Sequence, residues 1–391
     1  MELIGYVQNY DWGKLGNNSE VAQLTLANTP DCQIDEDKPY AELWMGDHQC
    51  GPSIVKSTGQ KLNEVLKERL SYLFKVLSIR KALSIQVHPN KKEAEKLHKD
   101  CPGLYDANHK PELAIALTPF TALCGFRPNC EIYEFCKNLP PLKKLLGGDK
   151  AIECLNTKTP GAVRPIYRNL MTTDEDDVAQ VIQCIADKYM TVLATYQLNE
   201  LFMTLNRDYP NDVGVLSLFF LNVIYLKPGE SIYLDANEIH AYIYGDCVEC
   251  MACSDNVIRA GLTPKYKDVE RLLDTLNYTG QVSENKIFKP KRLDANVQIF
   301  APPVKDFAVL HIQINDNEPY TLKLPNSSGI LLVLKGKRLL GLPGNTELTI
   351  KRGSIIYLSS QVMHSLEFKN FDSNNDNKDA FIAYIATRNR F

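Results

Sequence analysis

Hydrophobic residues in the first 127 positions form short apolar runs, separated by polar segments that contain glycine and proline. Residues 72–78 and 82–88 are two such runs, and their length and composition predict buried strands. Between the strands, apolar residues at helical spacing predict an amphipathic helix. Another helix is expected after Pro89, where Asn90 can cap the first turn and Glu93 can reach back to it. The amphipathic helix is defined by Leu62, Val65, Leu66 and Leu70.

The pattern changes to helical periods between residues 128 and 212. Residues 174–190 begin with four consecutive acidic residues, which favour the positive end of a helix dipole. Apolar residues then recur every three or four positions, as on one face of a helix. We therefore predict a helical insertion between two β-rich parts of the chain. The apolar positions of this helix are Val178, Val181, Ile182, Ile185 and Tyr189.

Strand patterns return after residue 212. The run 215–225 predicts a buried strand, and Pro228-Gly229 predicts a turn after it. Thr263-Pro264 predicts the start of a helix, because proline fits the first helical position. From about residue 290 onward, short strands alternate with turns, apart from a polar segment at 371–378 that is typical of mobile loops. The apolar stripe expected on the helix is Val269, Leu272, Leu273 and Leu276.

Two stretches of the chain share one frame: a glycine turn, a strand and, 11 residues after the glycine, a histidine. The first stretch ends at His240 and the second at His364. A repeated unit indicates a repeated architecture, and this pattern is typical of cupin-like jelly rolls. We predict a mainly β fold with a helical insertion, in which a cupin-like jelly-roll catalytic domain is followed by a second, C-terminal jelly roll. The predicted limits are 1–127 and 213–289 for the first jelly roll, 128–212 for the insertion and 290–391 for the second jelly roll.

Composition excludes several classes of protein. A chain of 391 residues is too long for one ordinary core, so two or three domains are expected. The net charge of −3 argues against a nucleic-acid groove. No run reaches the ~18 apolar residues that cross a bilayer, and the first residues lack the features of a secretory signal. Eleven cysteines without such a signal indicate reduced thiols in a cytoplasmic protein.

Cys247, Cys250 and Cys253 have a spacing found in some zinc and iron–sulfur sites. A strong motif of that kind needs a fourth ligand at a defined spacing, and none follows nearby. Steps of three along an extended chain also point to alternating faces. We therefore expect these cysteines to be structural thiols.

Four polar residues could supply a metal site to the first jelly roll. Gln86 and His88 lie two positions apart, so their side chains leave the same face if the segment is a strand. Glu112 and His240 come from separate segments. Two imidazoles and a carboxylate form a common zinc set, with Gln86 as a neutral, weaker ligand. Solvent-facing polar residues and a structural histidine are the alternative, and spacing alone does not show that the four residues converge.

Three cations accompany these candidate ligands. Lys75 interrupts the apolar run 72–78, where burying an unpaired ammonium would be costly. Either this strand has a solvent-exposed face, or Lys75 points into a polar cavity and meets an anion. Lys110 and Arg259 add positive charge near the ligands. Such a set suits a phosphorylated substrate, since Lys and Arg bind phosphate through charge-assisted hydrogen bonds.

Several motifs along the chain are long enough to compare with known families. They are Tyr10-Asp-Trp-Gly13, Ala41-Glu-Leu-Trp-Met-Gly46, Gln86-Val-His-Pro-Asn-Lys91, Asn108-His-Lys-Pro-Glu112 and the segment 245–265, which contains Ser-Asp-Asn-Val-Ile-Arg-Ala-Gly-Leu-Thr-Pro-Lys. In these motifs the chain closely resembles the type I mannose-6-phosphate isomerases, also called phosphomannose isomerases. The resemblance covers nearly the whole length.

The resemblance implies one zinc ion bound by Gln86, His88, Glu112 and His240, and the interconversion of mannose 6-phosphate and fructose 6-phosphate. It also implies an active-site role for Arg259. Further positions match residues associated with the substrate pocket of the family, and two positions depart from its pattern because they lack a proline that the family usually carries. The pocket residues are Ser84, Lys75, Lys110 and Asp255, and the departures are Ala82 and Ile239.

Such an isomerisation moves a proton between C1 and C2 of the open-chain sugar and passes through an enediol or enediolate. We expect the phosphate to rest on Ser84, Lys110 and Arg259 or a subset of them, with Lys75 either contributing or balancing carboxylates in the pocket. Arg259 remains protonated, so it can anchor substrate and stabilise an oxyanion but is a poor base. The carbon base is left open among Asp255, Lys110 and a metal-bound hydroxide, and Asp255 could instead pair with Arg259 and orient it.

Two other functions remain as alternatives: a cupin-type iron oxygenase, because such ligand sets also suit ferrous iron, and a non-catalytic sugar-phosphate-binding protein. We expect a small-molecule substrate, no nucleic-acid or membrane partner, and a cytoplasmic monomer that serves carbohydrate metabolism and GDP-mannose biosynthesis. No metal is expected beside His364, which lacks neighbours equivalent to the first site.

Overall fold

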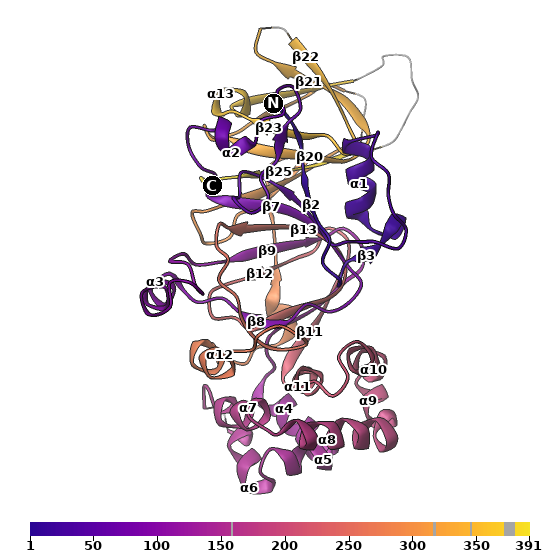
Figure 1. The fold of residues 1–391 in the computed structure, drawn as a ribbon, viewed down its shortest axis with the longest axis vertical. Helices are drawn as coiled ribbons and strands as arrows, with labels where there is room; N and C mark the ends of the chain where they lie inside the picture. The colour runs from indigo at the N-terminus through magenta and orange to yellow at the C-terminus, as the bar shows by residue number, and fades with distance from the viewer. Residues whose placement is uncertain (158, 316–317, 345, 371–379) are drawn as a thin grey trace.

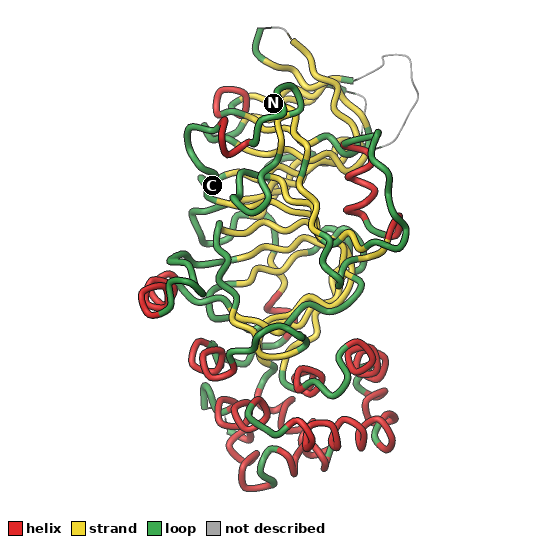
Figure 2. The backbone as a smooth tube through the Cα atoms, viewed as in Figure 1, coloured by secondary structure: helices red, strands yellow, loops and turns green. Residues whose placement is uncertain are grey.

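The computed structural model describes residues 1–157, 159–315, 318–344, 346–370 and 380–391. Its β-sheets are stacked along the long axis of an elongated molecule, and most of the helices gather at one end (Figures 1 and 2). Both chain termini lie in the half away from these helices (Figure 1). The mainly β fold with a helical insertion is therefore confirmed. In the described part of the chain, no helix is both long and apolar enough to cross a membrane.

The central sheet contains the strands of the first jelly roll. The sheet has two parts, which are joined through β13. They form two walls around an interior. One wall runs in the order β15 (Ile287–Phe288), β12 (Ser231–Leu234), β9 (Glu112–Ala116), β13 (His240–Ala252), β7 (Tyr72–Ile79), β5 (Glu42–Met45) and β2 (Tyr6–Gln8). The other wall has β10 (Phe120–Phe126) and β11 (Leu221–Leu226), and β8 (Ile85–Val87) with β14 (Ile258–Gly261), both joined to it through β13.

The second jelly roll combines a larger and a smaller sheet, and the N-terminal strand of the chain belongs to it. The larger sheet has the order β16 (Lys291–Arg292), β17 (Val297–Phe300), β18 (Ala308–Ile314), β25 (Phe381–Thr387), β20 (Gly329–Lys335), β23 (Ile355–Leu358), β1 (Glu2–Ile4) and β6 (Ile54–Val55). The smaller sheet has β19 (Tyr320–Lys323), β24 (Ser365–Lys369), β21 (Lys337–Leu342) and β22 (Thr346–Lys351), and β3 (Lys14–Leu15) pairs with β4 (Pro39–Tyr40) elsewhere. The domain limits given above stay a prediction, but β1 and β6 join a sheet of residues beyond 290.

Alternation along β7 shows how the layers are built, because all eight of its residues are buried. Tyr72, Phe74 and Val76 pack into a core shared with the C-terminal sheet. Leu77 and Ile79 point the other way, into the interior of the first jelly roll. Lys75 lies on that inner face. A strand that is buried on both faces reads as a continuous apolar run, and its one charged residue then marks a polar interior.

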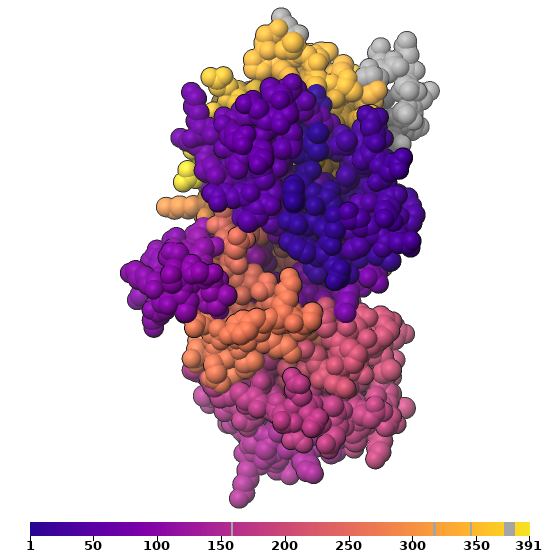
Figure 3. Space-filling view, in the orientation of Figure 1, coloured from indigo at the N-terminus to yellow at the C-terminus, as the bar shows by residue number. Residues whose placement is uncertain are grey.

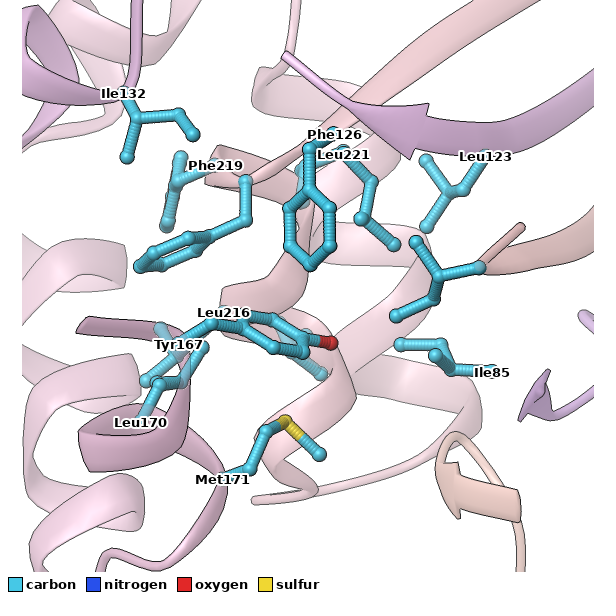
Figure 4. Close-up of a cluster of buried hydrophobic side chains, with 14 of the residues drawn as sticks. Ile85, Leu123, Phe126, Ile132, Tyr167, Leu170, Met171, Leu216, Phe219 and Leu221 are labelled. Atoms are coloured by element: carbon cyan, nitrogen blue, oxygen red, sulfur yellow. The ribbon is translucent and has the colours of Figure 1, made fainter. Parts of the chain in front are cut away.

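The insertion packs beneath the wall that contains β8 and β10. Ile85 and Leu123 of that wall share one core with Tyr167, Leu170 and residues from several other helices (Figure 4). The two parts are thus joined by a continuous apolar core. The helices are α4 (Asn129–Asn138), α5 (Pro140–Leu145), α6 (Asp149–Ile152), α7 (Val163–Met171), α8 (Glu175–Lys188), α9 (Met190–Thr195), α10 (Asn199–Asp208) and α11 (Val213–Leu216).

Helices outside the insertion show where sequence patterns succeeded and failed. The predicted cap is confirmed at α3, where Asn90 and Glu93 form both hydrogen bonds of a capping box. The helix expected from residue 62 to 70 is shorter, and the one expected at Thr263 begins later, after Asp268 caps it. Thr263 instead accepts a hydrogen bond from the Lys265 N–H, which makes a turn. These helices are α1 (Glu20–Asn28), α2 (Leu62–Val65), α3 (Lys91–Asp100), α12 (Val269–Thr275) and α13 (Ser360–Met363).

The predicted strand at 215–225 is wrong in its first half. Residues 213–219 form α11 and a short 3₁₀ helix, and the strand starts at Leu221. Apart from Ser217 and Asn222 the run is apolar, so its hydrophobic pattern has no period that separates a buried helix from a buried strand. The polar segment expected at 371–378 lies outside the described residues.

Candidate metal centre and cavity

Strand pairing brings the candidate metal ligands together from distant parts of the chain. Gln86 on β8 lies opposite His240, the first residue of β13, and opposite Arg259 on β14. His88 follows β8 directly, and the neighbours of Gln86 on this strand pack into the helical core. The side chains of Gln86 and His88 therefore share the other face, which looks into the first jelly roll. Glu112 enters the same interior from the start of β9.

Three of these side chains form a compact, buried group. Ligand atoms of His88, Glu112 and His240 all lie within 4.8 Å of one another. The Nε2 atom of His88 is 3.2 Å from one carboxylate oxygen of Glu112, and the Nε2 atom of His240 is 3.6 Å from the other. The amide nitrogen of Gln86 lies 3.2 Å from Nε2 of His240, so a rotation of this amide turns its oxygen toward the same point.

Hydrogen bonds behind the imidazoles fix which nitrogen is available. The Nδ1 atom of His88 is 2.6 Å from the backbone oxygen of Asn256, and Nδ1 of His240 is 2.9 Å from that of Glu238. A carbonyl oxygen only accepts, so each Nδ1 carries the proton and each Nε2 presents a lone pair to the group. This is the arrangement that metal-binding histidines need.

The group is also electrostatically incomplete. Nε2 of His88 and one oxygen of Glu112 are buried and have no hydrogen-bond partner in the described part of the chain. Burial lowers the pKa of His88 to about 4, which favours the neutral imidazole. Burial by itself raises the pKa of Glu112, but the Lys110 ammonium and the two imidazoles outweigh it and hold that pKa well below its usual value. Neutral imidazoles, an ionised carboxylate and orphaned lone pairs fit a divalent cation.

Two of the candidate ligands, Glu112 and Gln86, line a cavity of about 630 Å³. The other predicted site residues also line it: Ser84, Lys110, Arg259, Asp255 and Lys75. Lys110 is held by Glu112, with its Nζ atom 3.2 Å from the carboxylate. Ser84 donates to the oxygen of Gln86 at 3.4 Å. Asp255 is exposed and lies 3.7 Å from His48 Nε2, so its observed partner is His48 and not Arg259. The functional roles assigned to these residues stay predictions.

The position of Lys75 decides between the two interpretations of its strand. Lys75 is only 6% exposed, and its Nζ atom lies 3.0 Å from Glu249 and 3.5 Å from Glu42. Burial alone lowers the pKa of Lys75, but these carboxylates outweigh it and raise the pKa above its usual value. Lys75 therefore points into a polar cavity and meets two anions that belong to the protein.

Sequence reasoning missed several residues that line this cavity. Glu249 is buried, and desolvation raises its pKa even though Lys75 acts in the opposite direction. The sequence could have indicated Glu249 as a cavity residue, because it interrupts the apolar end of β13 as Lys75 interrupts β7. The same alternation places Glu42 and Trp44 on the inner face of β5, where the indole N–H donates to the Glu42 carboxylate. Tyr242, two residues after His240, has a buried hydroxyl without a partner.

The three closely spaced cysteines do not form a centre. Cys247 and Cys250 pack into different cores on opposite faces of β13, and Cys253 donates to the backbone oxygen of Leu70. All three are free thiols. The expectation of structural thiols on alternating faces is thus consistent with their placement.

The surface view relates this cavity to the chain as a whole. In Figure 3 the N-terminal part covers the sheets on one face, and the segment around residue 270 lies between it and the helical insertion. Cavity residues come from these same regions, including Tyr10, Trp12, Thr263 and Tyr209. The insertion therefore contributes directly to the cavity through Tyr209.

Comparison with family profiles gives two matches. Residues 1–129 match the catalytic domain of phosphomannose isomerase type I, and residues 149–221 match its helical insertion domain. The second match covers most of the helices described above.

Individual relatives and solved structures agree with these profiles. The chain is 40% identical to the human mannose-6-phosphate isomerase over 92% of this chain and 93% of that protein, and 39% identical to mannose-6-phosphate isomerase 2 of Arabidopsis thaliana, over 91% and 88%. It superposes on the apo mannose 6-phosphate isomerase of Salmonella typhimurium with a TM-score of 0.82, 27% identity and coverage of 99% and 98%. A zinc-bound mannose 6-phosphate isomerase gives a TM-score of 0.82 at 27% identity and 99% coverage of both chains. The chain therefore belongs to the type I phosphomannose isomerase family.

Proposed function

We propose that this protein interconverts mannose 6-phosphate and fructose 6-phosphate. The observation that carries the proposal is the buried group of His88, Glu112 and His240, whose Glu112 lines a cavity that is also lined by several cations. Membership of the isomerase family supports the same conclusion. A cavity of about 630 Å³ is large enough for a hexose phosphate, since ligand pockets commonly measure ~300–1,000 Å³.

The residues present suit one zinc ion per chain, held by His88, Glu112, His240 and the amide oxygen of Gln86. When bound, zinc supplies a Lewis acid that polarises the oxygens at C1 and C2 of the sugar. The protein fixes the ligands in advance, because the carbonyls of Asn256 and Glu238 hold both imidazoles in the tautomer that exposes Nε2.

Among the three cations singled out in the sequence, Arg259 is the best placed to receive an anionic group. It has no carboxylate partner within 4.0 Å among the described residues, and burial lowers the pKa of its guanidinium while leaving it charged at neutral pH. Lys110 and Ser84 lie nearer the metal group, through Glu112 and Gln86. Lys75 is already paired with two carboxylates, so we assign it to charge balance and leave phosphate binding to the other residues.

Proton transfer between C1 and C2 through an enediolate requires a base on the cavity wall. Lys110 forms an ion pair with Glu112 through its ammonium group, and an ammonium cannot accept the proton from carbon. Asp255 is exposed at the cavity edge, and its partner there is His48, 3.7 Å away. Glu249 is buried with a raised pKa, and a carboxyl group tuned upward toward neutrality is better suited to general base catalysis. We therefore add Glu249 to Asp255 and Lys110 as a candidate, and favour Glu249.

The test is a coupled assay with mannose 6-phosphate and detection of fructose 6-phosphate. We expect turnover in the purified protein, its loss after treatment with a chelator, and its recovery with added zinc. A variant carrying both Gln86→Ala and His240→Ala should be inactive under all three conditions. Turnover that survives this double substitution would refute the assigned site. Oxygen uptake with bound iron, in place of isomerisation, would favour the oxygenase alternative.

We further propose that the protein acts as a cytoplasmic monomer that feeds GDP-mannose synthesis. Support comes from its eleven cysteines, all of which are free thiols. Reduced thiols are typical of a reducing compartment. Light scattering of the purified protein should give the mass of a single chain, about 44.2 kDa.

A further inference from the structure

A lysine that the isomerase site does not yet use lines the cavity wall next to the helical insertion. Lys81 is partly buried, and its Nζ atom lies 4.3 Å from the centre of the Tyr209 ring. No carboxylate of the described residues lies within 4.0 Å of this ammonium, in contrast to Lys75 and Lys110. Its charge is therefore available to an anion that enters the cavity.

The backbone around Lys81 is held in place on both sides. The N–H groups of Arg80 and Lys81 both donate to the carbonyl oxygen of Trp12, at 3.0 and 3.1 Å. Two residues later, the Leu83 N–H donates to the carbonyl of Tyr242 at 2.7 Å. The segment that carries Lys81 is thus fixed between the N-terminal loop and β13, and leads directly into Ser84 and Gln86.

Tyr209 fixes the same segment from the insertion. It follows α10 directly, and its hydroxyl group donates to the carbonyl oxygen of Ala82 at 2.5 Å. Its ring faces the Lys81 ammonium, which is a cation–π arrangement. The insertion shares the apolar core of Figure 4 with β8 and β10, and Tyr209 packs against this core.

The charges of the cavity are divided in a way that leaves a place for a phosphate. Near the metal group, Lys75 and Lys110 are neutralised by Glu42, Glu249 and Glu112. Elsewhere on the wall, Lys81, Arg259 and Lys265 have no carboxylate partner within 4.0 Å among the described residues, and Lys81 and Lys265 rest on the rings of Tyr209 and Tyr10. Asp11 and Asp255 are the other acidic residues that line the cavity, and Asp255 lies 3.7 Å from His48.

We propose that Lys81 binds the phosphate group of the substrate and that Tyr209 is the positioning residue that aims its ammonium. The proposal rests on the proposed function and extends it, because it assigns the helical insertion a role in binding substrate. The ring keeps the lysine stem in one direction while leaving its N–H donors free, which lowers the cost of ordering the side chain when phosphate arrives.

The test compares Lys81→Gln, Lys81→Arg, Tyr209→Leu and Tyr209→Phe in the zinc-loaded protein, with Lys92→Gln on the exposed face of α3 as the matched control. In Lys81→Gln we expect KM for mannose 6-phosphate and the inhibition constant of inorganic phosphate to rise about tenfold, with a much smaller change in kcat. Lys81→Arg should recover most of the affinity. Tyr209→Leu should raise KM more than Tyr209→Phe, and the double variant Lys81→Gln/Tyr209→Leu should be no worse than Lys81→Gln alone.

Two failures are distinguishable. If the wild-type protein turns over mannose 6-phosphate and Lys81→Gln keeps the wild-type KM and phosphate inhibition, Lys81 does not bind phosphate. If the wild-type protein shows no turnover, the proposed function is wrong, and calorimetric binding of inorganic phosphate to the wild type and to Lys81→Gln still tests the lysine. Equal losses in Lys81→Gln and in the Lys92→Gln control would show that the effect is only general charge.

Discussion

The two jelly rolls contain the same Gly–strand–His frame, but among the described residues only the first gathers a His–Glu–His group around its histidine. Gly229 and Gly353 both adopt positive φ, at 89° and 82°, and the strands that follow occupy equivalent positions, as β12 and β23. Tyr233 and Tyr357 even pack against the same core between the two jelly rolls. The frame therefore specifies a turn and a strand of this fold, and nothing more.

The copies diverge after the strand. In the first, His240 opens β13, is fully buried, and faces Glu112 and Gln86. In the second, a short helix, α13, replaces the connection, and His364 caps it on the exposed surface. A histidine at a fixed sequence position becomes a ligand only where strands from elsewhere bring further ligands to it. The expectation that no metal binds beside His364 stays a prediction.

The largest contrast should appear when each histidine is removed. We expect His240→Ala to lower kcat for mannose 6-phosphate by about 10³-fold or more and to release zinc on dialysis, because a ligand of the Lewis acid is lost. His364→Ala should leave both properties unchanged. The measurements are steady-state kinetics and zinc content by atomic absorption. Equal effects of the two substitutions would abolish the distinction between the copies.

A second contrast is the loss of stability on removing a buried lysine of the first jelly roll or an exposed lysine of the second. Lys75→Met leaves Glu249 and Glu42 buried without their cation, and should destabilise the protein by about 3 kcal/mol. Lys351→Met, on an exposed strand position, should change stability by less than about 0.5 kcal/mol. Both are measured by urea unfolding.

The pH dependence of Lys75→Met sharpens this test. Burial raises the pKa of Glu249 in the folded protein, and loss of Lys75 raises it further. A carboxyl group whose pKa is higher in the folded than in the unfolded state binds protons more tightly when folded, so acid favours the folded state. The deficit of Lys75→Met should therefore shrink as the pH falls from 7 toward ~5. A deficit that grows in acid would contradict the assigned pairing.

The smallest contrast lies in the two turn glycines. An added Cβ at Gly229 meets nothing within 4 Å, so Gly229→Ala should cost only the strain of positive φ, about 1 kcal/mol. At Gly353 the Cβ would lie 2.6 Å from the Cβ of Ala27 and 2.8 Å from its carbonyl carbon. Gly353→Ala should therefore lower the thermal midpoint more than Gly229→Ala. The reverse order would show that α1 yields to the added methyl group.

Local features of the fold could be predicted because their causes are local. The capping box at Asn90 and the buried strand at residue 72 depend on neighbouring side chains, and both are confirmed. The prediction of a helix start at Thr263-Pro264 was wrong, because residues that cap a helix also form turns. Here Thr263 and Pro264 form a turn next to the cavity. The run at 215–220 is apolar except for Ser217, so its pattern does not distinguish a helix from a strand.

The site was less predictable from the residues alone, because it depends on strand register. Gln86 and His240 are 154 positions apart and lie opposite each other on two paired strands. The sequence of neither strand predicts that they pair in this register. Only the family resemblance joined the four ligands before the structure did. Glu249 escaped notice although a charged residue in an apolar strand was recognised as informative at Lys75.

The place of β1 has a consequence for how this chain reaches its fold. Glu2 and Leu3 pair with Ile356 and Ile355, and Asn28 donates to the carbonyl oxygens of both Leu3 and Gly353. Glu2 and Leu3 are thus synthesised early, but the strand with which they pair is synthesised only near the end of translation. Such distant pairing slows folding and leaves an open sheet edge in the meantime. During synthesis, this early segment is the one in greatest need of protection by a chaperone.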